Sequence, residues 1–263
     1  MATTQQSDVL VIGGGLAGLV TAYECLLAGK RVTLVDRDTR ERLGGLGLWA
    51  FGGMALVDTP LQRRMKIMDS PEIALRDWIR FGEISDADLL PRQWANYYVQ
   101  HCRSEVYDWL LGLGLKFLPA VNWVERGMQG NGNSLPRYHI LWGSSRQLIR
   151  CMIACVLKAG ESGRLTLLSS HRVTSIEYSA GIINGAIAIN ESNQQEIRLL
   201  APVVVMAMGG INGSHEQARH NWPQDRPMPT HMLNGAHPFA DGKLHQLVAA
   251  LGGQITHAGD MWN

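Results

Sequence analysis

Apolar runs and glycine clusters alternate at the start of the chain. Residues 8–12 form an apolar run rich in β-branched side chains, which predicts a buried parallel strand. A glycine-rich turn follows at once, and a helical stretch then runs to Ala28, with Gly29 as its C-terminal cap. Residues 31–35 predict a second buried strand, which ends at Asp36. The pattern therefore predicts a strand–helix–strand unit with a right-handed crossover.

The middle of the chain follows a helical pattern instead. Residues 60–118 are mostly helical by this criterion, and Pro71 stands where a proline opens the first turn of a helix. A loop rich in glycine, asparagine and proline spans residues 127–137, and a further helix is expected at about 144–159, before Gly160. The sequence thus predicts a helical insertion between two parts that contain strands.

From residue 164 onwards the pattern becomes β. Residues 165–168 and 171–178 are strand-like. Two further stretches, at 181–190 and 196–200, flank a polar turn, which suggests a small antiparallel meander. Residues 202–207 predict one more fully buried strand. A helix at about 242–251 and a short strand-like piece at 254–256 follow. The fold class is therefore α/β, with a Rossmann-like parallel sheet, an antiparallel β-meander and a helical insertion.

Composition narrows the classes of function. With 24 Lys and Arg against 23 Asp and Glu in 263 residues, the net charge of +1 lacks the basic footprint of a nucleic-acid-binding protein. A hydrophobic content of 46% excludes an intrinsically disordered chain. No apolar run reaches the roughly 18 residues of a membrane span, and the polar tail at residues 1–7 does not begin a signal peptide. Four cysteines are too few for a disulfide framework, so we expect a soluble, cytoplasmic protein.

The glycine-rich turn carries the strongest chemical signal. Gly13, Gly15 and Gly18 follow the spacing GxGxxG between a predicted strand and a predicted helix, which suits the approach of a pyrophosphate to the backbone. Asp36 stands 18 residues beyond Gly18 (36 − 18), where an acidic side chain binds ribose hydroxyls. Its charge opposes a 2′-phosphate, although Arg37 adjoins it. A glycine-rich turn without a ligand is the alternative, but the context favours a dinucleotide site.

A second glycine cluster favours FAD over NAD. Residues 44–53 contain five further glycines directly after the ribose-binding strand, which suits a cofactor that continues past its pyrophosphate. The predicted meander points the same way, because simple nicotinamide-binding folds rarely contain such a ribbon. Ordinary turns are the alternative for these glycines, and an NAD-binding dehydrogenase of unusual layout is the alternative for the whole chain.

Several motifs carry a resemblance to a known family. The chain resembles the N-terminal half of the FAD-binding dehydrogenases related to 3-ketosteroid Δ1-dehydrogenase and the fumarate reductase flavoprotein subunit. The resemblance covers residues 8–262. Its markers lie at residues 11–19, 44–45, 49–53, 58–64, 91–94, 136–140, 142–143, 208–210, 221–223 and 241–242.

The resemblance implies a set of FAD-binding residues. The ADP half would lie on Gly13, Gly15, Leu16, Ala17 and Gly18, with Asp36 and Arg37. The pyrophosphate and ribityl chain would lie beside Gly44 and Gly45, and the isoalloxazine beside Ala50, Gly52 and Gly53. The adenine would meet the backbone of Val173, and the cofactor would lie over Ala207, Gly209 and Gly210. No histidine stands between residues 44 and 53, so we expect noncovalent binding.

The same resemblance orders the chain into segments of one FAD-binding domain. These are a dinucleotide-binding unit at 8–59, the helical insertion at 60–160, the meander with its return strand at 161–212, and the start of a substrate or cap region at 213–263. In the family, the acid–base residues and a closing flavin-binding segment lie mostly beyond the matched part. We therefore expect an incomplete domain whose apolar face is covered by self-association or by a complementing chain.

Candidates for catalysis are fewer. Arg137 could neutralise a developing oxyanion and His139 could transfer a proton, while a surface arginine and a structural histidine are the alternative. The tyrosines cannot be ranked as acids or bases from sequence. Cys151 and Cys155 share a helical face and fit a core stripe better than a metal pair, so no metal site is predicted.

These features lead to two hypotheses about function. The first is an FAD-dependent oxidoreductase that moves a hydride between a C–C bond next to a carbonyl and flavin N5, with a small ketosteroid-like or unsaturated carbonyl compound as substrate. The second is a truncated or split flavin-binding module without independent catalysis.

Overall fold

The computed structural model describes residues 3–122, 132–256 and 258–259, and they fold into two compact units. Unit 1 comprises Met1–Leu48 and Met152–Asn263, and unit 2 comprises Trp49–Cys151. The sequence predicts the insertion at 60–160, whereas the compact unit runs from 49 to 151. Each unit is described by itself below.

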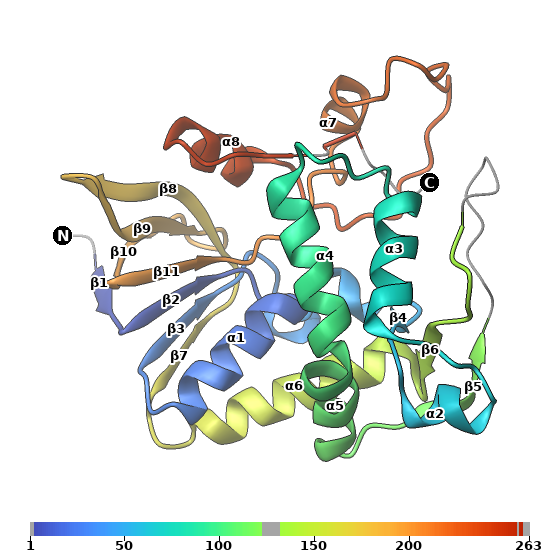
Figure 1. Cartoon of the computed structure of the whole chain (residues 1–263). Helices are drawn as coiled ribbons and strands as arrows, with labels where there is room; N and C mark the ends of the chain where they lie inside the picture. Colours follow the sequence, from blue (N-terminus) through green and yellow to red (C-terminus); the bar gives the residue numbers. More distant parts are fainter. Residues whose placement is uncertain (1–2, 123–131, 257, 260–263) are drawn as a thin grey trace. The chain divides into compact units, whose positions relative to one another are not determined.

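A four-stranded parallel sheet forms the centre of unit 1. Its order is β11-β2-β3-β7, with β2 at Val9–Ile12, β3 at Val32–Val35, β7 at Leu165–Leu168 and β11 at Val203–Met206. All residues of β2 and β3 are buried, as their continuous apolar sequences predict. Helix α1 (Leu16–Leu27) connects β2 with β3 and packs on both strands. The predicted strand–helix–strand unit is confirmed (Figure 1).

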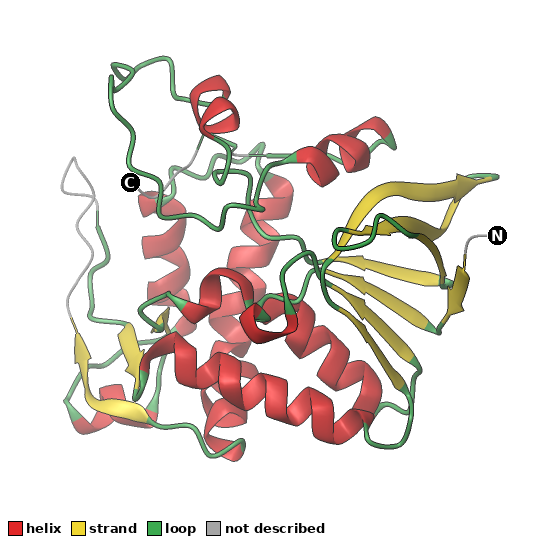
Figure 2. Cartoon of the chain, turned by 180° about the vertical axis from the view of Figure 1, so that it is seen from behind, coloured by secondary structure: helices red, strands yellow, loops and turns green. Residues whose placement is uncertain are grey.

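The meander forms a second sheet of unit 1. Its order is β1-β10-β9-β8, with β1 at Thr3–Gln6, β8 at His171–Ser179, β9 at Ile182–Asn190 and β10 at Glu196–Leu200. The two sheets adjoin in Figure 2 and share a core, because side chains of β2 and β3 pack against β8, β9 and β10. Leu10, Ile12 and Val35 lie in this core with Ala186, Ala188 and Leu199.

Unit 2 contains both helices and strands. Its helices are α2 (Pro60–Arg64), α3 (Pro71–Phe81), α4 (Leu89–His101), the π-helix η3 (Cys102–Asp108) and α5 (Trp109–Gly112). Helix α6 (Ser144–Gly160) begins in unit 2 and ends in unit 1. Strands β4 (Gly53–Ala55), β5 (Phe117–Asn122) and β6 (Tyr138–Leu141) form a sheet in the order β4-β6-β5.

The remaining elements of unit 1 are short. They are the 3₁₀-helices η1 (Arg40–Arg42) and η2 (Gly45–Leu48), helix α7 (His215–His220) and helix α8 (Lys243–Ala250). The predicted helix near 242–251 is confirmed by α8. Helix α3 begins at Pro71, as the sequence predicts, and Ser70 caps it by accepting a hydrogen bond from Ile73 N at 3.3 Å.

Four sequence predictions of secondary structure were wrong. Within the tail predicted at residues 1–7, Thr3–Gln6 form β1, because a polar edge strand needs only backbone pairing, here with β10. The helical region was extended over β5, and β4 and β6 were not foreseen, because each is short and none alternates cleanly. Residues 254–256 form no strand. Of the loop predicted at 127–137, residues 127–131 lie outside the described residues, as do 257 and 260–263 of the last segment.

Candidate cofactor site

The turn after β2 is built from glycines that the fold requires. Gly13 has a φ of 107° and donates its N–H to the carbonyl of Val35 at 2.8 Å. A Cβ on Gly13 would overlap the carbonyl of Ala207, and a Cβ on Gly18 would overlap the carbonyl of Gly13. These two glycines therefore allow the turn to pack tightly against the end of β11 and against α1.

Gly15 serves a different purpose. A Cβ at this position would meet no atom within 4 Å, so the protein itself does not require a glycine there. Gly15 is the N-cap of α1 without a side-chain cap, and the first intrahelical bond runs from Leu19 N to Gly15 O at 2.9 Å. The amides of Leu16, Ala17 and Gly18 precede that bond and lie at the positive end of the helix. This open, positive end fits the pyrophosphate of a dinucleotide.

The second glycine cluster lies against the first. Gly15 and Gly44 form an isolated parallel bridge, and a Cβ on Gly45 would lie 3.4 Å from the Cα of Gly15. Gly44 and Gly45 have φ values of 126° and 56°, which favour glycine. The two segments, far apart in sequence, therefore form one surface of bare backbone.

Asp36 closes this surface at the end of β3. Its Oδ2 accepts a hydrogen bond from Gly14 N at 2.5 Å, and its Oδ1 accepts one from Asp38 N at 2.7 Å. Burial raises the pKa of this carboxyl, and the two backbone hydrogen bonds partly offset that effect. Each carboxylate oxygen keeps a lone pair that a ribose hydroxyl can use.

The backbone that follows β11 completes the edge. Ala207 donates its N–H to Ile12 O at 2.8 Å, so the ends of β2 and β11 lie together. A Cβ on Gly209 or Gly210 would meet no atom within 4 Å, so the backbone is open there as well. The glycine turn, Asp36 and this segment thus share the carboxyl edge of the parallel sheet, where open α/β sheets bind their ligands.

Val173 lies elsewhere in unit 1. It belongs to β8, is 8% exposed and packs in the core between the two sheets. The pairing of β8 with β9 is irregular between Val173 and Ser175, which alters the backbone at this point. Its predicted contact with the adenine stays a prediction.

The predicted flavin segment lies in unit 2, where packing explains its glycines. Gly52 has a φ of 83°, and a Cβ there would lie 2.8 Å from the carbonyl carbon of Ser144. A Cβ on Gly53 would overlap the ring of Tyr138. Ala50 precedes the exposed side chain of Phe51, whose ring stacks on Tyr138 at 6.4 Å. The flavin contacts of this segment stay predictions.

Arg137 lies in a buried ionic network of unit 2. Its Nε and Nη2 donate to Asp69 at 2.8 Å each, and its Nη1 donates to Asp77 at 2.8 Å. The side chains of the arginine and both aspartates are 5%, 0% and 1% exposed. Burial works against the charged guanidinium, but the carboxylates outweigh it and raise the pKa of Arg137. This geometry favours the structural alternative over an oxyanion partner.

His139 is also enclosed. Its Nδ1 donates to the carbonyl of Arg137 at 2.7 Å, and its Nε2 lies 2.7 Å from Thr59 Oγ1, which leaves the ring neutral with both nitrogens bonded. The side chain is 0% exposed, and burial lowers its pKa. The catalytic role of His139 stays a prediction, and this environment supports a structural histidine.

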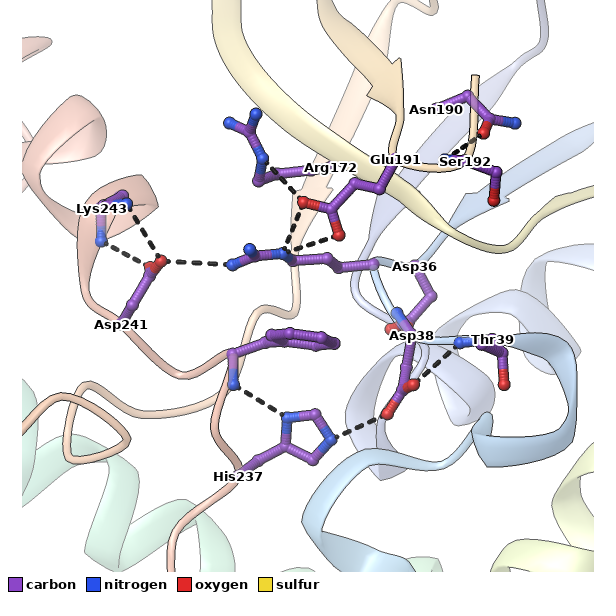
Figure 3. A network of polar contacts seen from close by, with 12 residues as sticks. Asp36, Asp38, Thr39, Arg172, Asn190, Glu191, Ser192, His237, Asp241 and Lys243 are labelled. Carbon is purple, nitrogen blue, oxygen red and sulfur yellow. Dashed lines mark hydrogen bonds and ion pairs between the residues drawn. The ribbon is translucent and has the colours of Figure 1, made fainter. Parts of the chain in front are cut away.

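Sequence reasoning missed the partners of Arg37. The guanidinium of Arg37 is bound to Glu191 and Asp241, so two carboxylates already balance its charge. Both carboxylates are labelled in Figure 3. Only Asp241 had a sequence signal, as part of the marker at 241–242. Neither Glu191 nor Phe239, which lies on the guanidinium, stands in a recognisable motif.

The described residues contain no group of three or more His, Cys, Asp or Glu side chains that could hold a metal ion. All four cysteines lie in the described residues, and none of the four forms a disulfide. Within the same residues, no helix combines the length and apolar character needed to cross a bilayer.

Known proteins are similar to this chain in sequence and in fold. The profile of the FAD binding domain family matches residues 8–263. A KsdD-like steroid dehydrogenase of Mycolicibacterium smegmatis is 34% identical over 98% of this chain and 50% of its own length. The fumarate reductase (cytochrome) of Shewanella frigidimarina is 32% identical over 80% of this chain and 34% of its own length. The chain thus spans half or less of these curated relatives.

The fold agrees with these matches. The crystal structure of 3-ketosteroid-Δ4-(5α)-dehydrogenase from Rhodococcus jostii RHA1, in complex with 4-androstene-3,17-dione, superimposes with a TM-score of 0.76. It is 21% identical, and the alignment covers 97% of this chain and 55% of that protein. The predicted fold class and the resemblance are confirmed, and FAD is the cofactor. The chain belongs to the FAD binding domain family, among oxidoreductases that include steroid dehydrogenases and fumarate reductases.

Proposed function

We propose that this chain is the FAD-binding part of an oxidoreductase that removes hydrogen across a C–C bond next to a carbonyl, or adds it in reverse. A ketosteroid-like compound is the substrate class, by analogy with the relatives named steroid dehydrogenases and with the neighbour that binds 4-androstene-3,17-dione. FAD, when bound, supplies the two-electron hydride chemistry at flavin N5.

The observation that carries this proposal is the backbone surface of Gly15 and Gly44 beside Asp36. A Cβ at Gly15 would not touch the protein, so packing does not require a glycine here. The missing side chain leaves space that a ligand can occupy. The α1 amides would hold the pyrophosphate, and Asp36 would hold the ribose hydroxyls. These groups bind and orient the cofactor, and the residue that moves the substrate proton is not assigned.

A second candidate is a flavin-binding module that depends on another segment for catalysis. Two facts favour it. Arg137 and His139, the catalytic candidates in this chain, are buried and bonded to other protein groups. The chain also spans half or less of its curated relatives.

One experiment separates the candidates. The purified chain is examined for flavin absorption that dithionite bleaches, and it is then given a 3-ketosteroid with an artificial electron acceptor that reoxidises the flavin. Bound flavin with turnover supports the enzyme, and bound flavin without turnover supports the module. A chain that cannot be reconstituted with FAD overturns both.

A matched pair of glycine variants ties the result to the site. Gly15→Val fills the open space in front of α1, and the φ of −73° at this residue suits a residue with a side chain. We expect a folded protein that binds FAD at least tenfold more weakly. Gly112→Ala is the control, because a Cβ there also meets no atom within 4 Å but lies in α5 of unit 2.

A further inference from the structure

The two residues after Asp36 contact a distant segment of unit 1. Arg37 Nη1 donates to Asp241 Oδ2 at 3.3 Å, and its guanidinium carbon lies 4.3 Å from the ring centroid of Phe239. His237 Nε2 lies 3.2 Å from Asp38 Oδ2. We call residues 237–241 the strap. Each of these three side chains meets Arg37 or Asp38, which follow β3. Figure 3 shows the contact of His237 with Asp38.

Arg37 is held in place for this contact. Its Nε donates to the two carboxylate oxygens of Glu191 at 3.2 and 3.1 Å, directly after β9. Arg172 Nε donates to the same carboxylate at 3.0 Å, so Glu191 is fixed as well. The guanidinium therefore has ion pairs on two sides and an aromatic ring on its face, which is an arrangement specific to arginine.

The strap itself has no helix or strand. Two short-range bonds shape it, from Ala240 N to His237 O at 2.9 Å and from Phe239 N to His237 Nδ1 at 3.3 Å. Gly213 N donates to Ala240 O at 2.9 Å, and α8 follows with Leu244 packed against the core of unit 1. The strap is thus anchored at its C-terminal end, while its side chains reach the end of β3.

The strap adjoins the part of the cofactor site that recognises ribose. Asp36 is the residue before Arg37, and His237 is near enough to lower the pKa of the Asp36 carboxyl, although burial has the larger, opposite effect. Phe239 is 37% exposed, so the strap lies at the surface beside Asp36. The strap therefore lies next to the predicted position of the adenosine half of a dinucleotide.

We propose that the strap retains FAD by closing over the adenosine end of the cofactor site. The contact between Arg37 and Phe239 holds the strap in this closed position. This role rests on FAD binding but not on the proposed reaction. It concerns the adenosine diphosphate half of the cofactor, which other dinucleotides and ADP share. Arg37 then acts through Phe239 and Asp241 as a positioning residue and does not pair with a phosphate.

The test measures cofactor release from the FAD-loaded chain. The FAD-loaded chain is diluted into an excess of the apoprotein of an unrelated flavoprotein, which traps the released cofactor. Release is followed by FAD fluorescence. We expect Phe239→Ala to release FAD about tenfold faster than the parent chain, which corresponds to 1.4 kcal/mol. Phe239→Leu should give a smaller increase, because it keeps apolar contact without the aromatic face. ADP affinity, measured by calorimetry on the apoprotein, should fall by the same factor.

A control variant shows whether the effect on release is specific to the strap. Arg198→Ala breaks an ion pair with Glu177 at 2.6 Å on the meander, away from the strap, and should leave release unchanged. An unchanged release rate in Phe239→Ala overturns the proposal, and so does an equal increase in Arg198→Ala or an unchanged ADP affinity. If Phe239→Ala does not fold, the same comparison is made with Phe239→Leu. Failure of steroid turnover leaves this test untouched, whereas a parent chain without FAD affinity overturns the function and the strap together.

Discussion

The buried pairing of Arg137 with Asp69 and Asp77 allows a direct test of its role. Replacing Arg137 by alanine removes three hydrogen bonds of 2.8 Å. It leaves the carboxylate of Asp69, which is 0% exposed, without this cation, whereas Asp77 keeps an ion pair with Arg80 at 3.2 Å. If Arg137 is structural, the variant should lose stability. If Arg137 is catalytic, the variant should lose turnover with little effect on stability.

The expected magnitude follows from burial. Breaking a buried ion pair by removing one partner costs about 3–5 kcal/mol, because an uncompensated charge remains in the interior. This is a large part of the roughly 5–15 kcal/mol that stabilises a typical domain. We therefore expect unit 2 of Arg137→Ala to be unfolded or close to it at neutral pH.

The loss should depend on pH in a specific direction. In the parent chain, burial raises the pKa of Asp77, but hydrogen bonds from Ser134 and Arg137 outweigh it and hold the pKa below its usual range. That contribution is present above the unfolded pKa and is lost only in strong acid. Without Arg137, Asp77 loses the arginine's part of this effect, while the hydrogen bonds from Ser134 and the ion pair with Arg80 at 3.2 Å remain. The stability difference between the two proteins should therefore stay constant from pH 7.5 to pH 5 and shrink only in stronger acid, where Asp77 of the parent chain takes up its proton.

Urea unfolding of the apoprotein, followed by circular dichroism at both pH values, measures this difference. Arg63→Ala is the matched control, because it removes an arginine paired with Asp58 at 2.6 Å but 57% exposed, and it should have little effect. A variant that loses less than about 1 kcal/mol at both pH values would refute the structural assignment.

Two further outcomes follow from single residues. Gly13→Ala should destabilise unit 1 by about 1–3 kcal/mol and impair FAD loading, because the φ of 107° and the contact with Ala207 exclude a Cβ. Equal urea midpoints for this variant and for Gly112→Ala would contradict this expectation. His139→Gln should flatten the pH dependence of stability between pH 7 and pH 5. Burial lowers the pKa of His139, so its stabilisation is present above the unfolded pKa of about 6.5 and is lost as the pH falls below it; identical slopes in parent and variant would count against this.

The strands of unit 2 mark the limit of prediction from pattern. β4 has three residues and β6 has four, so neither is long enough to show a period. They form because they pair with each other and with β5 across up to 87 residues, from Gly53 to Ile140 (140 − 53). In contrast, β2 and β3 are predictable because burial on both faces requires an unbroken apolar run.

The sequence alone determined the turn that prepares the cofactor site. Gly13, Gly15 and Gly18 act locally, through backbone angles and the space that a missing Cβ leaves, so their spacing predicts both the turn and its ligand. The tertiary structure alone decided what Arg37 and Arg137 do. Both are charged residues near a predicted site, and only the folded chain shows that Asp241, 204 residues away, holds one and Asp69, 68 residues away, holds the other. A charge acts through whatever lies within a few ångströms, and that neighbourhood is set by the fold rather than by adjacent residues.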